Sequence, residues 1–233
     1  MKYQISQQQL DKITFHFDGE VFYGVLQWWY PLFWQRLAGC GPACATNLLA
    51  CIDPNTKLVT KQDCILAMRA MWKHVTPGLR GLNKVENFAK GCDSFFAEHK
   101  MPYKCNYVKI NPKTPAHFDK MIEFLKNSFA CDQPVAFLNL SNGDIKDLER
   151  WHWVTIVGIE QVDDDYIATV FDSDFKFEMS LKLWFKTATN PAGFAALHKW
   201  AFKKCQKSMA QYIVQQSYKA FRLLIRCSGY TNK

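Results

Sequence analysis

The sequence lacks long apolar runs, an apolar leader and internal repeats, and each absence narrows the class of protein. Its first residues, MKYQISQQQLDK, are polar, so they do not predict a secretory signal. No window approaches the ~20 consecutive apolar residues that a membrane-spanning helix needs. The 9 cysteines are irregularly spaced and odd in number. We therefore expect a cytoplasmic protein with free thiols and no membrane span, because disulfide frameworks belong to oxidising compartments.

A module that would recognise nucleic acid is also lacking, although the chain is basic. Lys and Arg number 29 against 21 acidic residues, which gives a formal charge of +8. Such an excess can favour nucleic acid, an anionic membrane surface or an acidic substrate. The lysines are scattered, however, and no segment interleaves basic and aromatic side chains in a recognisable pattern. We expect a solvated basic surface and predict no nucleic-acid partner.

The apolar period changes along the chain from helical to strand-like. Helices are predicted at residues 41–52, 62–72, 82–99 and 118–130, and strands at 134–140, 152–160, 166–172 and 176–181, with one or two more strands within 12–29. Residues 192–216 predict a further helix, and 218–226 a last strand. Short polar turns favour antiparallel pairing. The order predicts one α+β domain over 1–233, with a helical part at about 30–130 and a sheet part at about 131–233 that includes the N-terminal strands.

Cys40 has the surroundings of a nucleophile. It immediately precedes the helix predicted at 41–52, and the unpaired N–H groups of a helix N-terminus favour an anion such as a thiolate. Gly41 and Pro42 shape the start of the helix and leave the sulfur uncrowded. Cys44 lies one turn further on and shares the same face, so it is either a core residue, a resolving thiol or the nucleophile itself.

A nucleophilic thiol needs a base, and His152 is the histidine best placed to be one. It begins an apolar strand directly after the polar loop 141–150, where a side chain is held firmly yet faces a cleft. An antiparallel hairpin through residues 162–165 would bring Asp172, at the end of the next strand, beside it. Asp172 would then hold the imidazole in one tautomer, with Asp174 as the alternative.

The oxyanion of a tetrahedral intermediate needs hydrogen-bond donors. Gln35, just before Cys40, is a candidate side-chain donor. The backbone N–H of Cys40 is the natural second donor. These two groups complete a predicted catalytic set of Cys40, His152, Asp172 and Gln35.

These residues, in this order, resemble the C39-type peptidases of the papain-like superfamily. The resemblance rests on Gln35, Cys40-Gly41-Pro42-Ala43, His152-Trp153-Val154 and Phe171-Asp172, and covers about residues 35–185. It implies a papain-like α+β fold, in which the nucleophile helix packs on an antiparallel sheet. It also implies a cysteine peptidase-like hydrolase that cleaves peptide or amide bonds through a thioester, with no metal or organic cofactor. Gly39 and Ser173 depart from the family, which commonly has an acidic residue and a proline there.

Three functions remain open at this point. The first is hydrolysis of a peptide or protein substrate, or of a small amide or thioester. The second is acyl transfer to an amine by the same residues, as in transglutaminase-like enzymes. The third is a catalytically silent binding module. A metal site built from Cys40, Cys44 and Cys51 is disfavoured, because their spacings are not those of a zinc finger or ribbon. The oligomeric state is not predicted.

Overall fold

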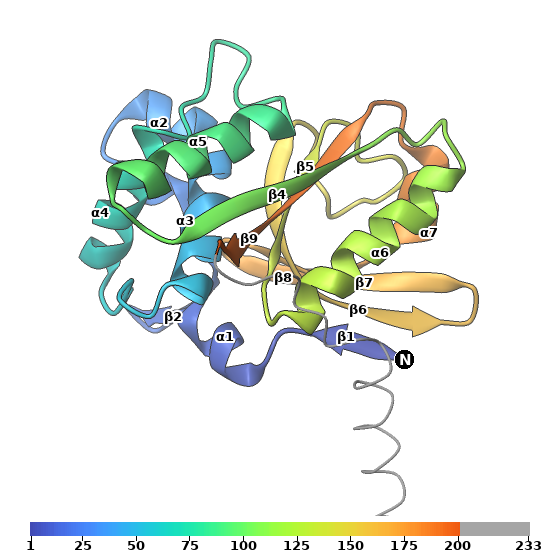
Figure 1. Ribbon diagram of the computed structural model, residues 1–233, viewed down its shortest axis with the longest axis horizontal. Coiled ribbons are helices and arrows are strands. Elements are labelled where there is room, and N and C mark those ends of the chain that lie inside the picture. Colours follow the sequence, from blue (N-terminus) through green and yellow to red (C-terminus); the bar gives the residue numbers. More distant parts are fainter. Residues whose placement is uncertain (201–233) are drawn as a thin grey trace, which may run out of the picture. The chain divides into compact units, whose positions relative to one another are not determined.

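The computed structural model describes residues 1–200, in which helices pack against a mainly antiparallel sheet (Figure 1). The strands are β1 (Lys2–Gln4), β2 (Thr14–Phe17), β3 (Glu20–Tyr23), β4 (Tyr103–Ile110), β5 (Val135–Asn139), β6 (His152–Val162), β7 (Asp165–Asp172), β8 (Phe175–Ser180) and β9 (Ala192–Lys199). The helices are α1 (Gln7–Lys12), the 3-10 turn η1 (Gln27–Trp29), α2 (Phe33–Ala38), α3 (Cys40–Ile52), α4 (Lys61–Trp72), α5 (Val85–Glu98), α6 (Ala116–Ala130) and α7 (Leu181–Thr187).

Seven strands form the main sheet, in the order β4-β9-β5-β6-β7-β8, and β1 pairs with the far end of β6. Every pairing is antiparallel. The hairpin between β6 and β7 turns where Val162 opposes Asp165, as predicted, so the end of β7 returns beside the start of β6. The strands β2 and β3 form a separate two-stranded sheet.

Each face of the sheet is covered by different helices. Alternate side chains of a strand point to opposite faces, so Leu138 of β5 joins the core under α3 and α5. Its neighbour Phe137 packs against Trp184 of α7 on the other side, with ring centroids 5.1 Å apart. Figure 1 shows α6 and α7 on one side of the sheet and α3 with α5 on the other. The helix α3 is therefore clamped between the sheet and the outer helices, which fixes the position of its first residue.

The predicted helices and strands before residue 190 are present, with ends shifted by a few residues. The helix predicted at 192–216 is wrong for its first part, because 192–199 is β9. Its sequence, AGFAALHK, is rich in alanine and favours a helix locally. Nevertheless, β9 lies between β4 and β5 in the sheet and is mostly buried, so backbone pairing decides its conformation. The rest of that helix and the strand predicted at 218–226 lie outside the described residues.

Several elements were not foreseen, namely β1, α1, α2, β4 and α7. The strand β4 falls inside the stretch assigned to the helical part, yet it pairs with β9 along eight residue pairs. Helical and sheet parts are therefore interleaved along the chain. Residues 1–200 all fall within one compact unit. A single domain over 1–233 stays a prediction for the remaining residues.

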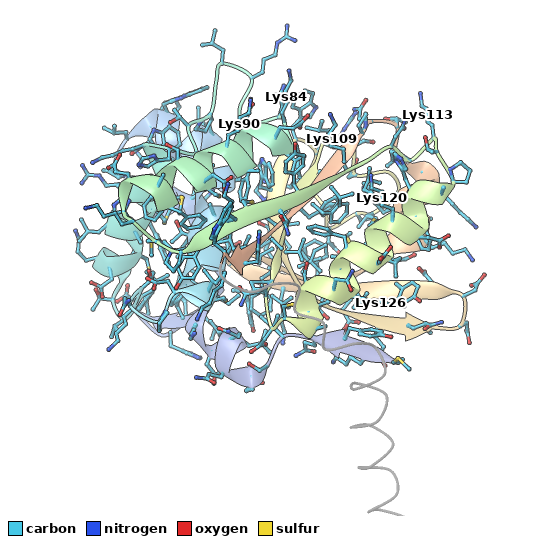
Figure 2. The ribbon with its side chains drawn as sticks, viewed as in Figure 1. Lys84, Lys90, Lys109, Lys113, Lys120 and Lys126 are labelled. Carbon is cyan, nitrogen blue, oxygen red and sulfur yellow. The ribbon has the colours of Figure 1, made fainter. Side chains whose placement is uncertain are left out.

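The basic residues are spread over the surface. Figure 2 labels lysines on α5, on β4 and around α6. Some of their charge is already engaged: Lys109 lies 2.6 Å from Glu86, and Lys126 donates to the Tyr166 hydroxyl at 2.9 Å. A search of the described residues finds no helix that is long and apolar enough to span a bilayer. The absence of a nucleic-acid partner stays a prediction.

Candidate active site

Cys40 is the first residue of α3, and a second short helix, α2, leads directly into it through Gly39. Two glycines let the chain turn here: a Cβ on Gly39 would lie 2.3 Å from the Gln35 carbonyl, and one on Gly41 would lie 2.7 Å from Leu82. Within the described residues, neither the amide of Cys40 nor that of Gly41 donates a hydrogen bond. The helix therefore presents two free N–H groups beside a partly exposed thiol.

His152 and Asp172 form a hydrogen-bonded pair, as predicted from the hairpin. The imidazole Nε2 lies 2.8 Å from Asp172 Oδ1, and the two side chains are only 13% and 7% exposed. Asp174, the alternative, is an exposed residue of the following turn. Burial alone lowers the pKa of His152, but the hydrogen bond that its ring donates to Asp172 and the nearby Cys40 sulfur outweigh burial and raise that pKa well above the ordinary value.

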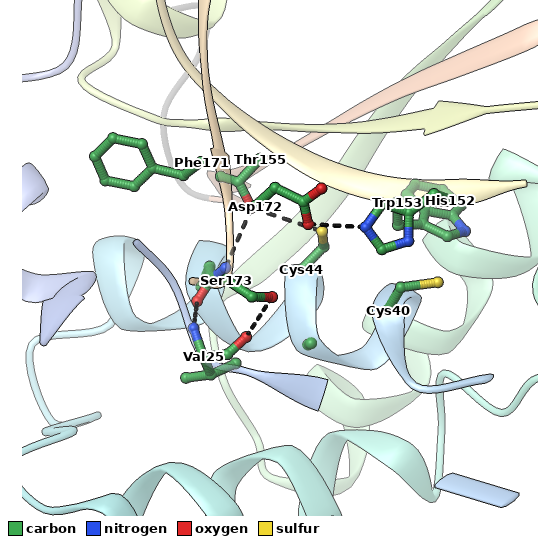
Figure 3. A pocket seen from close by; sticks show the side chains of 11 residues that line it. Val25, Cys40, Cys44, His152, Trp153, Thr155, Phe171, Asp172 and Ser173 are labelled. Carbon is green, nitrogen blue, oxygen red and sulfur yellow. Dashed lines mark hydrogen bonds and ion pairs between the residues drawn. The ribbon is translucent and has the colours of Figure 1, made fainter. Parts of the chain in front are cut away.

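Cys40, His152 and Asp172 line one pocket, which has about 220 Å³ of empty space (Figure 3). The Nε2 atom of His152 is hydrogen-bonded to Asp172. The other ring nitrogen, Nδ1, faces Cys40, as Figure 3 shows. Apolar side chains complete the walls, among them Trp153 and Phe171. The structure thus brings together three of the four predicted site residues, although Cys40 lies more than 100 positions before the other two in the chain.

The floor of the pocket was not foreseen from the sequence. Asn47 of α3 accepts from the Val25 amide at 2.9 Å and donates to Thr155 of β6 at 3.2 Å. Both partners of this bridge line the pocket, as does Asn47 itself. The helix that carries Cys40 is therefore tied to the strand that carries His152. The sequence does place Asn47 two turns after Cys40 on the same helix face. Polar residues are common in helices, however, so this spacing alone does not predict a pocket residue.

Hydrogen bonds from the end of the β2–β3 hairpin and the residues after it hold the turn that follows Asp172. The Tyr23 amide donates to the Ser173 carbonyl at 2.6 Å. The Ser173 hydroxyl donates to the Val25 carbonyl at 3.4 Å, as Figure 3 shows. Ser173 has a positive φ of 61°, a conformation that non-glycine residues rarely adopt. These contacts fix the turn that follows the aspartate. No local sequence pattern predicts these contacts, because the two segments are about 150 residues apart.

The loop before His152 is anchored rather than free. Asn139, fully buried in β5, donates to the Glu149 carbonyl at 2.6 Å. Leu148 is 1% exposed, and the Asp144 amide donates to Thr187 of α7 at 2.9 Å. The last loop residue, Trp151, is about half exposed and has φ = 58°. The loop therefore delivers His152 in a fixed position, and these contacts favour a surface connection over a lid.

Cys44 is a buried core residue, which makes it a poor candidate for the nucleophile. It is 4% exposed, and the Thr155 hydroxyl donates to its sulfur at 3.6 Å. Burial is the main cause that raises the pKa of its thiol well above the ordinary value, and the hydrogen bond from Thr155 only partly opposes it. A thiol that stays protonated at neutral pH is a poor nucleophile. Burial therefore favours Cys40 over Cys44 as the candidate nucleophile.

Gln35 lies in α2 with 8% exposure, and it is not one of the residues that line the pocket. Its Oε1 is buried and has no hydrogen-bond partner among the described residues. The structure therefore places Gln35 next to the Cys40 segment without showing its amide in the pocket. No metal-binding cluster in the described part of the chain contains Cys40, Cys44 or Cys51.

Comparisons with known proteins add no relative to this picture. No protein-family model matches the chain, and no curated protein matches it. The function is therefore inferred from the residues of the pocket.

Proposed function

We propose that this chain is a papain-like thiol hydrolase, which cleaves a peptide or amide bond through a thioester on Cys40. One observation carries the proposal. A histidine bound to a buried aspartate at 2.8 Å shares a pocket with a cysteine at the start of a helix. Nucleophile, base and orienting acid in one pocket are what acyl transfer requires.

The proposed reaction begins with attack of the Cys40 sulfur on the substrate carbonyl carbon. The raised pKa of His152 favours a protonated imidazole at neutral pH, and this imidazolium stabilises the neighbouring thiolate. It then gives its proton to the leaving amine as the C–N bond breaks. Water attacks the resulting thioester, His152 takes the proton of that water, and the acid product leaves with the thiolate restored. Asp172 keeps the ring oriented throughout.

The oxyanion would be stabilised by the start of α3. The amides of Cys40 and Gly41 have no other partner among the described residues, and they lie at the positive end of the helix. Gln35 is the candidate for an additional donor. Its Nε2 would reach the oxyanion only if the amide points toward the pocket from α2.

Two features favour a polypeptide substrate over a small amide. The empty space of the pocket includes open solvent, and its walls leave room for only about one water molecule, so it cannot enclose a drug-sized molecule. The segment that leads into Cys40 also exposes large apolar side chains, namely Trp28, Leu32, Phe33, Trp34 and Leu37. Exposed apolar patches typically mark interaction surfaces. We infer that only the reacting group enters the pocket and that flanking residues of the substrate lie on this patch.

Alkylation tests the nucleophile before any substrate is known. The full chain is treated briefly with iodoacetamide at neutral pH, and each modified cysteine is located by mass spectrometry of peptides. We expect Cys40 to react first, and we expect His152→Asn to slow that reaction. Cys131, which is also partly exposed, is the matched thiol. Equal rates at Cys40 and Cys131 would contradict the proposal and favour a binding module.

A second measurement separates hydrolysis from acyl transfer. Peptide thioesters that carry apolar residues are incubated with the chain, with and without an added primary amine. The proposed hydrolase gives the free acid in both cases, and Cys40→Ala gives neither product. A dominant amide product in the presence of amine would instead assign the same residues to a transferase.

A further inference from the structure

Three metal-ligating side chains meet at the far end of α5, away from the pocket. The potential ligand atoms of His74, Glu98 and His99 all lie within 4.8 Å of one another. His74 Nε2 is 3.6 Å from Glu98 Oε2. This separation is close to the ~3.3 Å between two ligands that each bond a tetrahedral Zn²⁺ at 2.0–2.1 Å. None of the three residues lines the pocket of Cys40.

Each of the two imidazoles has one nitrogen engaged by a neighbouring group, which leaves its other nitrogen available for a ligand. His99 Nδ1 lies 2.9 Å from the Phe95 carbonyl, so it must be the protonated nitrogen, and Nε2 keeps its lone pair. His74 Nδ1 lies 3.0 Å from the Ser94 hydroxyl, which leaves its Nε2 facing Glu98. Metal-binding histidines almost always have such a partner on the second nitrogen, because it fixes the tautomer and the ring.

The rings are also held in place by packing. Phe95 stacks on His99 with centroids 4.2 Å apart and meets His74 edge-on at 5.5 Å. The His74 side chain is only 9% exposed, although its Nε2 has just the carboxylate of Glu98 as a neighbour at ion-pair distance. The imidazole of His74 thus points at an exposed carboxylate and lies near a second imidazole. All three groups can bind the same ion.

The local charge favours a cation in spite of two nearby lysines. His99 is the C-cap of α5, where the last carbonyl groups give the helix its negative end. Glu98 adds a formal negative charge. Lys73 and Lys100 are next to ligands in the chain, but both are exposed, so solvent screens them.

We propose that His74, Glu98 and His99 bind one divalent ion of the zinc type. Two imidazoles and one carboxylate suit Zn²⁺ and its neighbours Co²⁺ and Ni²⁺ better than Mg²⁺ or Ca²⁺, which prefer oxygen ligands. Water would complete the tetrahedron. The ion joins the segment after α4 to the last turn of α5 and takes no part in the reaction at Cys40, so this site stands independently of the proposed function.

The test is a metal titration of the full chain in a Cys40→Ser background, because a reactive thiolate would itself bind zinc. Zn²⁺ binding is followed by calorimetry, and Co²⁺ binding by its visible spectrum. We expect one equivalent to bind, with the spectrum of a cobalt ion held by nitrogen and oxygen. The affinity should fall about tenfold or more in His99→Asn and Glu98→Gln, and by a similar factor in Ser94→Ala, which removes only the partner of His74.

Matched controls are His16→Asn and Glu123→Gln, which change exposed residues elsewhere and should leave the affinity unchanged. Because His74→Asn alters a mostly buried ring, the folding of this variant is checked by circular dichroism. His99→Asn and Glu98→Gln change exposed residues, so the fold is expected to tolerate them. The proposal is overturned by unchanged affinity in those two variants, by the absence of a bound equivalent, or by a cobalt–thiolate charge-transfer band in place of the expected spectrum.

Discussion

The described part of the chain contains two histidine–carboxylate pairs, which differ in burial, in distance and in their third neighbour. His152 and Asp172 are both nearly buried and lie 2.8 Å apart, and a thiol completes their surroundings. His74 and Glu98 lie 3.6 Å apart, the carboxylate is 66% exposed, and a second imidazole completes their surroundings. A histidine and a carboxylate are thus placed next to a thiol in one case and next to a second imidazole in the other.

The third neighbour of each pair, a thiol or a second imidazole, is what distinguishes the two proposed roles. A buried carboxylate at hydrogen-bond distance orients an imidazole and favours its charged form, which suits proton transfer to and from sulfur. An exposed carboxylate at a longer distance leaves the imidazole nitrogen available for a ligand. The pairs can therefore be tested against each other, and four predictions follow this contrast from the largest expected effect to the smallest.

The largest expected difference is between the effects of replacing His152 and of replacing His74 on the turnover rate. We expect His152→Asn to lower the rate of thioester hydrolysis by about 10³–10⁴-fold, because it removes both the base and the acid of the reaction. His74→Asn should leave the rate within about threefold, since general acid–base catalysis requires contact with the reacting atoms. Steady-state rates on one apolar peptide thioester measure both. Comparable losses in two well-folded variants would mean that the contrast drawn here is wrong.

The two carboxylates should differ next. We expect Asp172→Asn to lower turnover by about 10²–10³-fold, because an amide neither holds the productive tautomer nor stabilises the imidazolium. Since Asp172 contributes to the raised pKa of His152, the alkaline fall in activity should also move to lower pH in this variant. The pH–rate profile reports both effects. Glu98→Gln is the matched control and should reproduce the wild-type profile.

A variant of Gln35 tests whether this side chain acts on the pocket of Cys40. If its amide assists the N–H groups of Cys40 and Gly41, Gln35→Ala should lower the rate constant kcat by about 10–100-fold, below the loss seen when a principal oxyanion donor is removed. The Michaelis constant should change little, because the contact forms only in the transition state. A change in thermal stability with unaltered kcat would assign Gln35 to packing alone.

The smallest effect is on stability. The pKa of folded His152 lies above its unfolded value, so its protonated form stabilises the fold fully below about pH 6.5. This contribution is lost as the pH rises through the raised pKa. We expect the free energy of unfolding, measured with urea, to decline from neutral to alkaline pH. Asp172→Asn should flatten that decline and Glu98→Gln should keep it; a steeper decline in Asp172→Asn would reverse the assigned cause.

Much of the fold could be predicted because its local signals agree with its tertiary context. The apolar stripe of α6 and the short apolar runs of β5 and β6 have only one stable interpretation each, so they are present where expected. The same holds for α3, whose start at Cys40 follows from Gly41 and Pro42. His152 and Asp172 could be paired because a hairpin with a short turn fixes its own register.

Other elements could not be predicted because their neighbours decide them. The alanine-rich segment of β9 prefers a helix by itself, and only its place between β4 and β5 makes it a strand. The hydrogen bond between Tyr23 and Ser173 joins segments about 150 residues apart, and no local sequence pattern predicts it. The cluster of His74, Glu98 and His99 likewise depends on how the end of α4 meets α5.

The sequence by itself determined the chemistry that is present: a thiol at a helix start, an imidazole at a strand start, and an aspartate one hairpin away. Spacing and period along the chain contain that information. The tertiary structure alone decided which sulfur is accessible, since Cys40 is partly exposed while Cys44 is buried. It also decided which carboxylate is withdrawn from water. Burial and long-range contact depend on the packing of distant segments, so they are settled only when the chain has folded.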